Sequence, residues 1–165
     1  MPGIKILLIT LISLILSNPV LSFAEVRKEY YPSGELKTEA NYKNGKLEGI
    51  SRFYYESGQV KGEGYWKNDK LEGIGKIYYK NGQVGTEINY KNDKADGVAK
   101  SYYESGQLHE EGNFKNGEKD GIAKWYFENG AIRYIDTYKN GQKINRKAYD
   151  RRGRLRSDQN YPYRE

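Results

Sequence analysis

One six-residue phrase returns through this chain of 165 residues at a constant interval. It reads YYESGQ at both Tyr54 and Tyr102, and near-copies begin at Tyr30, Tyr78 and Tyr126. A fixed period of this kind is the signature of a repeat architecture, in which each unit packs mainly on its neighbours in the sequence.

A second phrase lies between the copies of the first and also carries turn residues. It reads YKNGKLEG from Tyr42, and its other copies begin at Trp66, Tyr90, Phe114 and Tyr138. Each unit therefore holds two turn signals about twelve residues apart, a spacing typical of a run of β-hairpins. We predict an all-β fold that consists of a thin, elongated sheet. We expect the turn in the second phrase to be a longer loop than the turn in the first.

The first phrase predicts a strand register if its loop has two residues. Asn81-Gly82 and Asn129-Gly130 suit the positive backbone dihedral angles of such a loop. Cations then face glutamates in four units: Arg52–Glu63, Lys28–Glu39, Lys76–Glu87 and Lys100–Glu111. Aromatic residues face aliphatic ones beside them: Tyr31–Leu36, Tyr55–Val60, Tyr79–Val84, Tyr103–Leu108 and Phe127–Ile132. Cross-strand pairs of both kinds stabilise sheets.

The composition favours a protein that has order but little conventional core. The chain has 17 tyrosines and 19 glycines, whereas Leu, Ile and Val are sparse after Ala24. A close-packed core needs more aliphatic volume than this. The aromatic content nevertheless argues against disorder.

The N-terminal segment 1–24 has the features of a secretory signal peptide. Lys5 precedes an apolar run from Ile6 to Leu16, which is shorter than the about 20 residues of a membrane-spanning helix. Small residues follow at Ser22 and Ala24, so we predict cleavage after Ala24. We expect export to the periplasm or the medium, with no membrane span in the mature chain. An uncleaved N-terminal anchor is the alternative.

The positive charge is concentrated at the C-terminus. From Lys139 onward the chain holds nine basic and three acidic residues, although the whole chain has a net charge of only +6. We predict a repeat domain at 25–147 and a basic, partly disordered tail at 148–165. The tail arginines expected to attract anions are Arg151, Arg152, Arg154 and Arg156. Anionic lipid or a cell-wall polymer is the expected ligand class, because export disfavours nucleic acid.

Catalytic chemistry is poorly represented in the sequence. There is no cysteine, and the single histidine, His109, occupies a column that is basic in other units. Each repeated glutamate has a cation predicted opposite it, which favours structural pairing over acid–base catalysis. The acidic turns lack the spacing of a calcium-binding loop. We therefore expect no enzyme activity, no metal and no cofactor.

Two aromatic columns are candidates for partner contact, because aromatic residues are enriched in interface cores. One contains Trp66, on the face that also holds the small residues Gly62 and Gly64. The other accompanies the cation–glutamate pairs on the opposite face, and its members are Tyr54, Tyr78, Tyr102 and Tyr126. These tyrosines and Trp66 are the predicted partner-binding residues, and substitution for a missing aliphatic core is the alternative.

The two phrases together resemble the MORN repeat in its bacterial variant, which includes antitoxin-like members of the YwqK type. The resemblance covers about residues 27–145. It implies a single-layered, twisted antiparallel sheet with two strands per repeat and no catalysis. It also implies a scaffold that binds a protein partner or the cell envelope. Neutralisation of a toxin by direct binding, and binding of anionic lipid or glycan through the aromatic face and the basic tail, are the alternatives.

Overall fold

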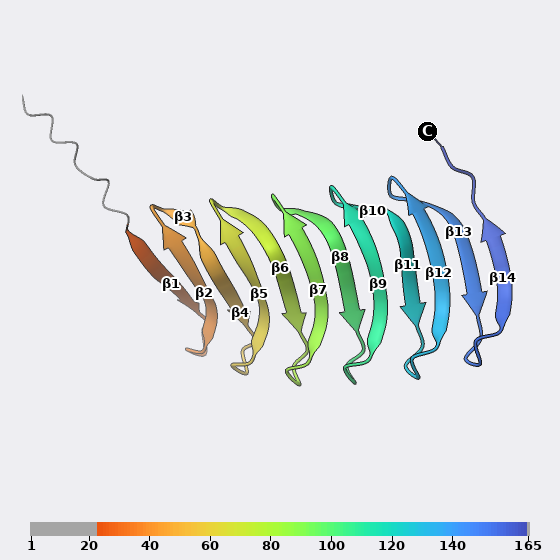
Figure 1. Ribbon diagram of the computed structural model, residues 1–165. Helices are drawn as coiled ribbons and strands as arrows, with labels where there is room; N and C mark the ends of the chain where they lie inside the picture. The colour runs from red at the N-terminus through yellow and green to blue at the C-terminus, as the bar shows by residue number, and fades with distance from the viewer. Residues whose placement is uncertain (1–22, 165) are drawn as a thin grey trace, which may run out of the picture.

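The computed structural model describes residues 23–164, which form one open antiparallel sheet (Figure 1). Residues 1–22 of the predicted signal segment 1–24 lie outside the described residues. The strands are β1 (Ala24–Tyr30), β2 (Leu36–Lys43), β3 (Lys46–Leu47), β4 (Gly49–Tyr54), β5 (Val60–Lys67), β6 (Lys70–Tyr78), β7 (Val84–Lys91), β8 (Lys94–Tyr102), β9 (Leu108–Lys115), β10 (Glu118–Lys119), β11 (Gly121–Tyr126), β12 (Ile132–Lys139), β13 (Gln142–Tyr149) and β14 (Leu155–Asn160).

The sheet is a meander, so each strand pairs with the strands that precede and follow it. The order runs from β1 to β14, with the short strands β3 and β10 pairing beside it with β2 and β9. Figure 1 shows the hairpins in a row, with the two ends of the described chain at opposite ends of the sheet. The prediction of an elongated, single-layer all-β fold is confirmed.

The second phrase forms the tightest turns, which corrects the prediction of a longer loop there. Asn68 and Asp69 both have positive φ, at 51° and 65°, and Lys67 pairs directly with Lys70. This is the two-residue hairpin that Asn-Gly and Asn-Asp pairs favour, because their short side chains tolerate the left-handed region. The same geometry recurs at Asn44, Asn92, Asn116 and Asn140.

The first phrase forms a three-residue loop, not the predicted two-residue loop. The amide of Gly58 donates to the Tyr55 carbonyl, and the amide of Tyr55 donates to the Gln59 carbonyl. Only the glycine of this loop has a positive φ, at 88°. A type I turn followed by a left-handed glycine has this pattern.

This loop changes one predicted column of pairs and leaves the other intact. Tyr54, and not Tyr55, pairs with Val60, so the predicted aromatic–aliphatic column is wrong by one residue. An irregularity then leaves Lys61 without a ladder partner and restores the predicted pair Arg52–Glu63. The same shift recurs in the other hairpins, and Lys28–Glu39, Lys76–Glu87 and Lys100–Glu111 are confirmed.

The C-terminal tail is more ordered than predicted. Tyr149 ends β13, the three-residue loop recurs with Gly153 at φ 77°, and β14 pairs with β13 from Asn145 to Tyr149. The prediction of partial disorder from residue 148 is therefore wrong for most of the segment. The cause is that YDRRG, from Tyr149 to Gly153, supplies the same turn geometry as YYESG, from Tyr54 to Gly58, despite its different composition.

Contacts between neighbouring hairpins replace a hydrophobic core. Ala123 is the one apolar side chain classed as fully buried among residues 23–164. A row of tyrosine hydroxyls in the loops instead donates to backbone carbonyls of the next hairpin, each at 2.7 Å: Tyr31 to Tyr54, Tyr55 to Tyr78, Tyr79 to Tyr102 and Tyr103 to Tyr126. Each such bond stabilises by about 0.5–1.5 kcal/mol.

Candidate functional site

The sheet has two faces of different chemistry. Side chains alternate along each strand, so Arg52 and Glu63 lie on one face while Phe53 and Trp66 lie on the other. We call the first the ladder face, after its rows of cation–glutamate pairs. We call the second the groove face.

The predicted tyrosine row lies on the ladder face and is half-buried. The hydroxyl of Tyr78 donates to Glu63 at 2.8 Å, and the hydroxyl of Tyr126 donates to Glu111 at 2.6 Å. Tyr102 makes the same contact with Glu87. Tyr54, the first predicted member, is also half-buried. The hydroxyls of Tyr78, Tyr102 and Tyr126 therefore join neighbouring hairpins.

The same contacts shift the acid–base behaviour of both groups. Burial, reinforced by the hydrogen bond to Glu63, raises the pKa of Tyr78 to about 12. Burial and the bond to Glu111 raise the pKa of Tyr126 likewise to about 12. The hydrogen bond from Tyr78 lowers the pKa of Glu63 despite partial burial of that carboxylate. The tyrosine is thus held as a neutral donor and the glutamate as a charged acceptor.

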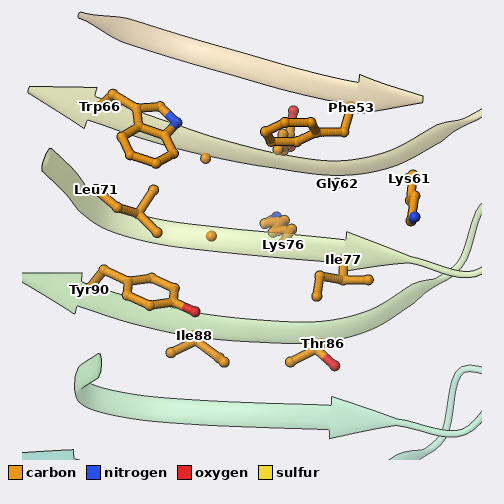
Figure 2. Close-up of a pocket in the computed structure, with 13 residues that line it drawn as sticks. Phe53, Lys61, Gly62, Trp66, Leu71, Lys76, Ile77, Thr86, Ile88 and Tyr90 are labelled. Atoms are coloured by element: carbon orange, nitrogen blue, oxygen red, sulfur yellow. The ribbon is translucent and has the colours of Figure 1, made fainter. Parts of the chain in front are cut away.

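The groove face carries an apolar groove of about 340 Å³ across β4 to β7 (Figure 2). Trp66 stands at one end beside Leu71, and Tyr90 lies across from them on β7. Phe53 and Ile77 border the other end. Trp66 therefore lies on the face opposite the tyrosine row, as the sequence predicts, together with Phe53, Leu71 and Ile77, which the sequence did not single out.

Glycines form the floor of the groove. A Cβ atom at Gly64 would lie 2.7 Å from Leu71 Cδ1, and one at Gly75 would lie 3.0 Å from the Tyr90 ring. The absence of side chains at these two positions is thus what keeps the aromatic and aliphatic walls close to the backbone. A concave, mostly apolar site of this kind is the usual form of a binding pocket.

The walls of the groove are exposed, and two buried polar atoms in this region lack hydrogen-bond partners within the described residues. Phe53 and Ile77 expose 45% and 56% of their surfaces. Within residues 23–164, the buried Trp66 Nε1 and Ser51 Oγ atoms have no hydrogen-bond partner. An unmade bond of this kind costs about 1–3 kcal/mol, so this region is stabilised less by its own contacts than the rest of the sheet.

The ladder face has an exposed aliphatic row of its own. One member stands in each repeat, and each exposes about half of its surface: Val26, Ile50, Ile74, Val98 and Ile122. Two of its members, Val98 and Ile122, line a hollow of about 270 Å³ together with the charged residues Glu111 and Lys124. The row is the competing surface for partner contact.

The C-terminal part of the groove face is filled by charged side chains. Lys119 Nζ lies 4.8 Å from the centre of the Trp125 ring and pairs with Glu110. Arg146 donates to both carboxylate oxygens of the fully buried Asp136 at 2.7 Å. These cation–aromatic and ionic contacts occupy the positions that are apolar or empty farther toward the N-terminus.

The predicted anion-binding tail is partly neutralised by its own turn. Arg154 and Arg156 both contact the Asp150 carboxylate, at 2.8 and 2.6 Å. Burial alone would raise the pKa of Asp150. Hydrogen bonds donated by the backbone amides of Arg154 and Arg152, and by the Arg154 side chain, instead lower this pKa to about 2. Arg151 lies over the Phe127 ring. Two of the four predicted arginines therefore serve the fold of the last hairpin.

Other predicted residues have local roles in the described part of the chain. His109 occupies the unpaired position of its hairpin and lies 3.2 Å from Ser101 Oγ. No group of three or more acidic or histidine side chains converges as a metal site among residues 23–164, and the same residues include no helix of the length and apolarity needed to cross a bilayer. Ala24 begins β1, and cleavage after it stays a prediction.

Comparison with known proteins identifies the repeat. The family model described as MORN repeat variant matches residues 26–44, 47–68, 95–116 and 119–140, and the MORN repeat model matches 63–84. No curated protein matches. Among solved structures, the chain is similar to one described as "Crystal structure of accessory secretory protein 1,2 and 3 in Streptococcus pneumoniae", with 15% identity and a TM-score of 0.24. That match covers 74% of this chain and 18% of the other, and a TM-score this low carries no argument.

Proposed function

Because this chain belongs to the family of MORN repeat variants, which are often protein- or membrane-binding modules, we propose that it is a non-catalytic scaffold that binds a protein through the groove face. The observation that carries this proposal is the groove between Phe53, Trp66, Ile77 and Tyr90.

The composition of the groove favours a protein segment over the other ligand classes. Its walls are aromatic and aliphatic, and aromatic residues are the usual anchors of protein interfaces. A cell-wall glycan presents many hydroxyls, whereas most side chains that line the groove are aromatic or aliphatic. An anionic lipid would select the basic tail, where Asp150 already engages two arginines. Toxin neutralisation is one specific form of the same protein-binding function.

Two isoleucines of β6 provide a matched test. Ile77 borders the groove and is 56% exposed, whereas Ile74 lies on the ladder face and is 52% exposed. The tagged full chain, Ile77→Ser and Ile74→Ser are used for affinity capture from the native cells, with washes at low and high salt. We expect one stoichiometric protein that survives high salt and is lost only with Ile77→Ser.

Three other results would contradict the proposal. Loss of the captured protein with Ile74→Ser alone would assign binding to the aliphatic row of the ladder face. Retention of lipid or polymer that high salt releases would assign it to the basic tail. Equal capture by all three proteins would show that neither the groove nor the aliphatic row of the ladder face contributes to binding. Toxicity of the captured protein, relieved by this chain, would identify the antitoxin-like form.

A further inference from the structure

Both ends of the sheet are open and expose residues that are covered elsewhere. Within residues 23–164, no strand pairs with the outer edge of β1 or of β14. Tyr30 on β1 is 58% exposed, although its counterparts Tyr78 and Tyr126 are half-buried. Leu155 on β14 is 55% exposed, although its counterpart Ile132 is half-buried. Each end lacks the neighbouring hairpin that every internal hairpin has.

Internal hairpins meet through one repeated register. At the first four junctions a glutamate of the earlier hairpin pairs with a cation of the later one: Glu39 with Arg52, Glu63 with Lys76, Glu87 with Lys100, and Glu111 with Lys124. The junction between β12 and β13 keeps this register, with Ile135 opposite Lys147.

The two open edges carry the two halves of this pair. Lys28 on β1 holds the cation position, because it pairs with Glu39 inside the first hairpin. Asp158 on β14 holds the acidic position, because it pairs with Lys147 inside the last hairpin. Strand direction alternates along the meander, so a strand added after β14 would run in the same direction as β1.

We propose that the protein assembles head to tail, with β14 of one copy pairing antiparallel with β1 of the next so that the sheet continues between copies. The internal register then places Asp158 opposite Lys28 of the next copy. The flanking pairs are Ser157 with Glu29 and Gln159 with Arg27, by analogy with Gly62–Ile77 and Ile88–Ala99 at the internal junctions, and neither pair opposes like charges.

The same register supplies a partner for the exposed tyrosine. At internal junctions Tyr78 and Tyr126 donate to the acidic residue of the preceding hairpin, and continuation brings Tyr30 beside Asp158. Charged residues on edge strands commonly oppose pairing with other chains, but here the charges of the two edges are complementary. Because the two surfaces differ, the contact is heterologous and yields open chains or closed rings. All the β1 residues involved follow the predicted cleavage position at Ala24.

A charge exchange tests the proposal. The sedimentation of the full chain is measured over a range of concentrations and compared with Lys28→Glu, Asp158→Lys and an equimolar mixture of the two. The control is Lys61→Glu, an exposed lysine without a ladder partner inside the array, and circular dichroism checks that each variant retains its sheet.

We expect the unaltered chain and the control to form a concentration-dependent series of assemblies. Each single variant places like charges at every junction, so half-assembly should need at least about tenfold more protein. The mixture should restore assembly, because the altered β1 edge of Lys28→Glu complements the altered β14 edge of Asp158→Lys, and the two unaltered edges complement each other.

Several results would overturn the proposal. These are a monomer at all concentrations, assembly that neither variant weakens, and a mixture that assembles no better than its components. A dimer that is lost with Lys28→Glu but unaffected by Asp158→Lys would indicate pairing of β1 with itself. Pairing of either edge only with a different protein would indicate strand addition by a partner.

Discussion

The two ends of the groove face share one backbone plan and differ in what fills it. Across β4 to β7, Gly64 and Ile88 lie in the column that Gly112 and Asp136 occupy toward the C-terminus. The first region leaves an exposed apolar groove, whereas the second closes its surface with Asp136, Arg146 and Lys119. The repeat therefore sets the geometry, and individual substitutions within a column decide whether that geometry is open for binding.

The largest effect is expected where the closed region depends on a buried charge. Asp136→Ala leaves Arg146 and Lys143 without their shared carboxylate, and we expect a loss of about 3 kcal/mol in unfolding free energy. The matched substitution in the open region, Ile88→Ala, removes a half-buried side chain and should cost about 1 kcal/mol. Urea unfolding measures both. Equal losses would show that the two regions are held together in the same way.

Exchange of two side chains should close the open region. Thr86 and Ala95 occupy, one repeat earlier, the positions of Glu110 and Lys119. Thr86→Glu with Ala95→Lys should reproduce the ion pair beside Tyr90 and lower the affinity of the groove for the apolar dye anilinonaphthalene sulfonate about tenfold. The reverse double variant, Glu110→Thr with Lys119→Ala, should increase dye binding near Trp125. Fluorescence titration that finds both variants unchanged would argue against the comparison.

The tyrosine row in the loops should contribute equally to stability in both regions, up to its last member, Tyr103. Tyr103→Phe removes the 2.7 Å bond to the Tyr126 carbonyl, which should cost about 1 kcal/mol. One repeat later this position is Phe127, so that hairpin packs on its neighbour without such a hydroxyl. The exposed Tyr65 provides the control, and Tyr65→Phe should change unfolding free energy by less than about 0.5 kcal/mol in the same urea experiment. An equal loss in both variants would contradict this role of the row.

The smallest effect expected is a dependence of stability on alkaline pH. The usual pKa of tyrosine is near 10, and in the folded chain the pKa of Tyr78 is raised to about 12. The fold favours the protonated form, so this stabilisation is complete below pH 10 and declines as the pH rises through 12. The thermal midpoint should therefore fall over this window, and Tyr78→Phe should reduce the slope. A midpoint in Tyr78→Phe that falls as steeply as in the unaltered chain would assign the dependence to other groups.

The fold can be predicted from the sequence because each strand pairs with its neighbours in the chain and the same pairing recurs in every repeat. Pairs such as Lys100–Glu111 follow from spacing alone, and the structure confirms them. The shorter loop is predicted in the wrong phrase because glycine follows asparagine in both phrases. The irregularity at Lys61 compensates for the longer loop, so the charged pairs are correct although the loop is not.

The candidate site is harder to predict than the fold. Tyr78 can be assigned to its face, but its bond to Glu63 depends on how far neighbouring hairpins approach one another. The groove exists because Gly64 and Gly75 lie beneath side chains from other strands. Its signal in the sequence is a set of small residues beside Trp66, which indicates close packing without indicating a hollow surface.

Photo-crosslinking from β6 would identify which face of the sheet contacts a partner. A benzophenone amino acid is placed at position 77 on the groove face or at position 74 on the ladder face, and both proteins are irradiated in the native cells. We expect a discrete crosslink to another protein from position 77 and none from position 74. A crosslink from position 74 alone, or none from either position, would contradict the assignment of partner binding to the groove.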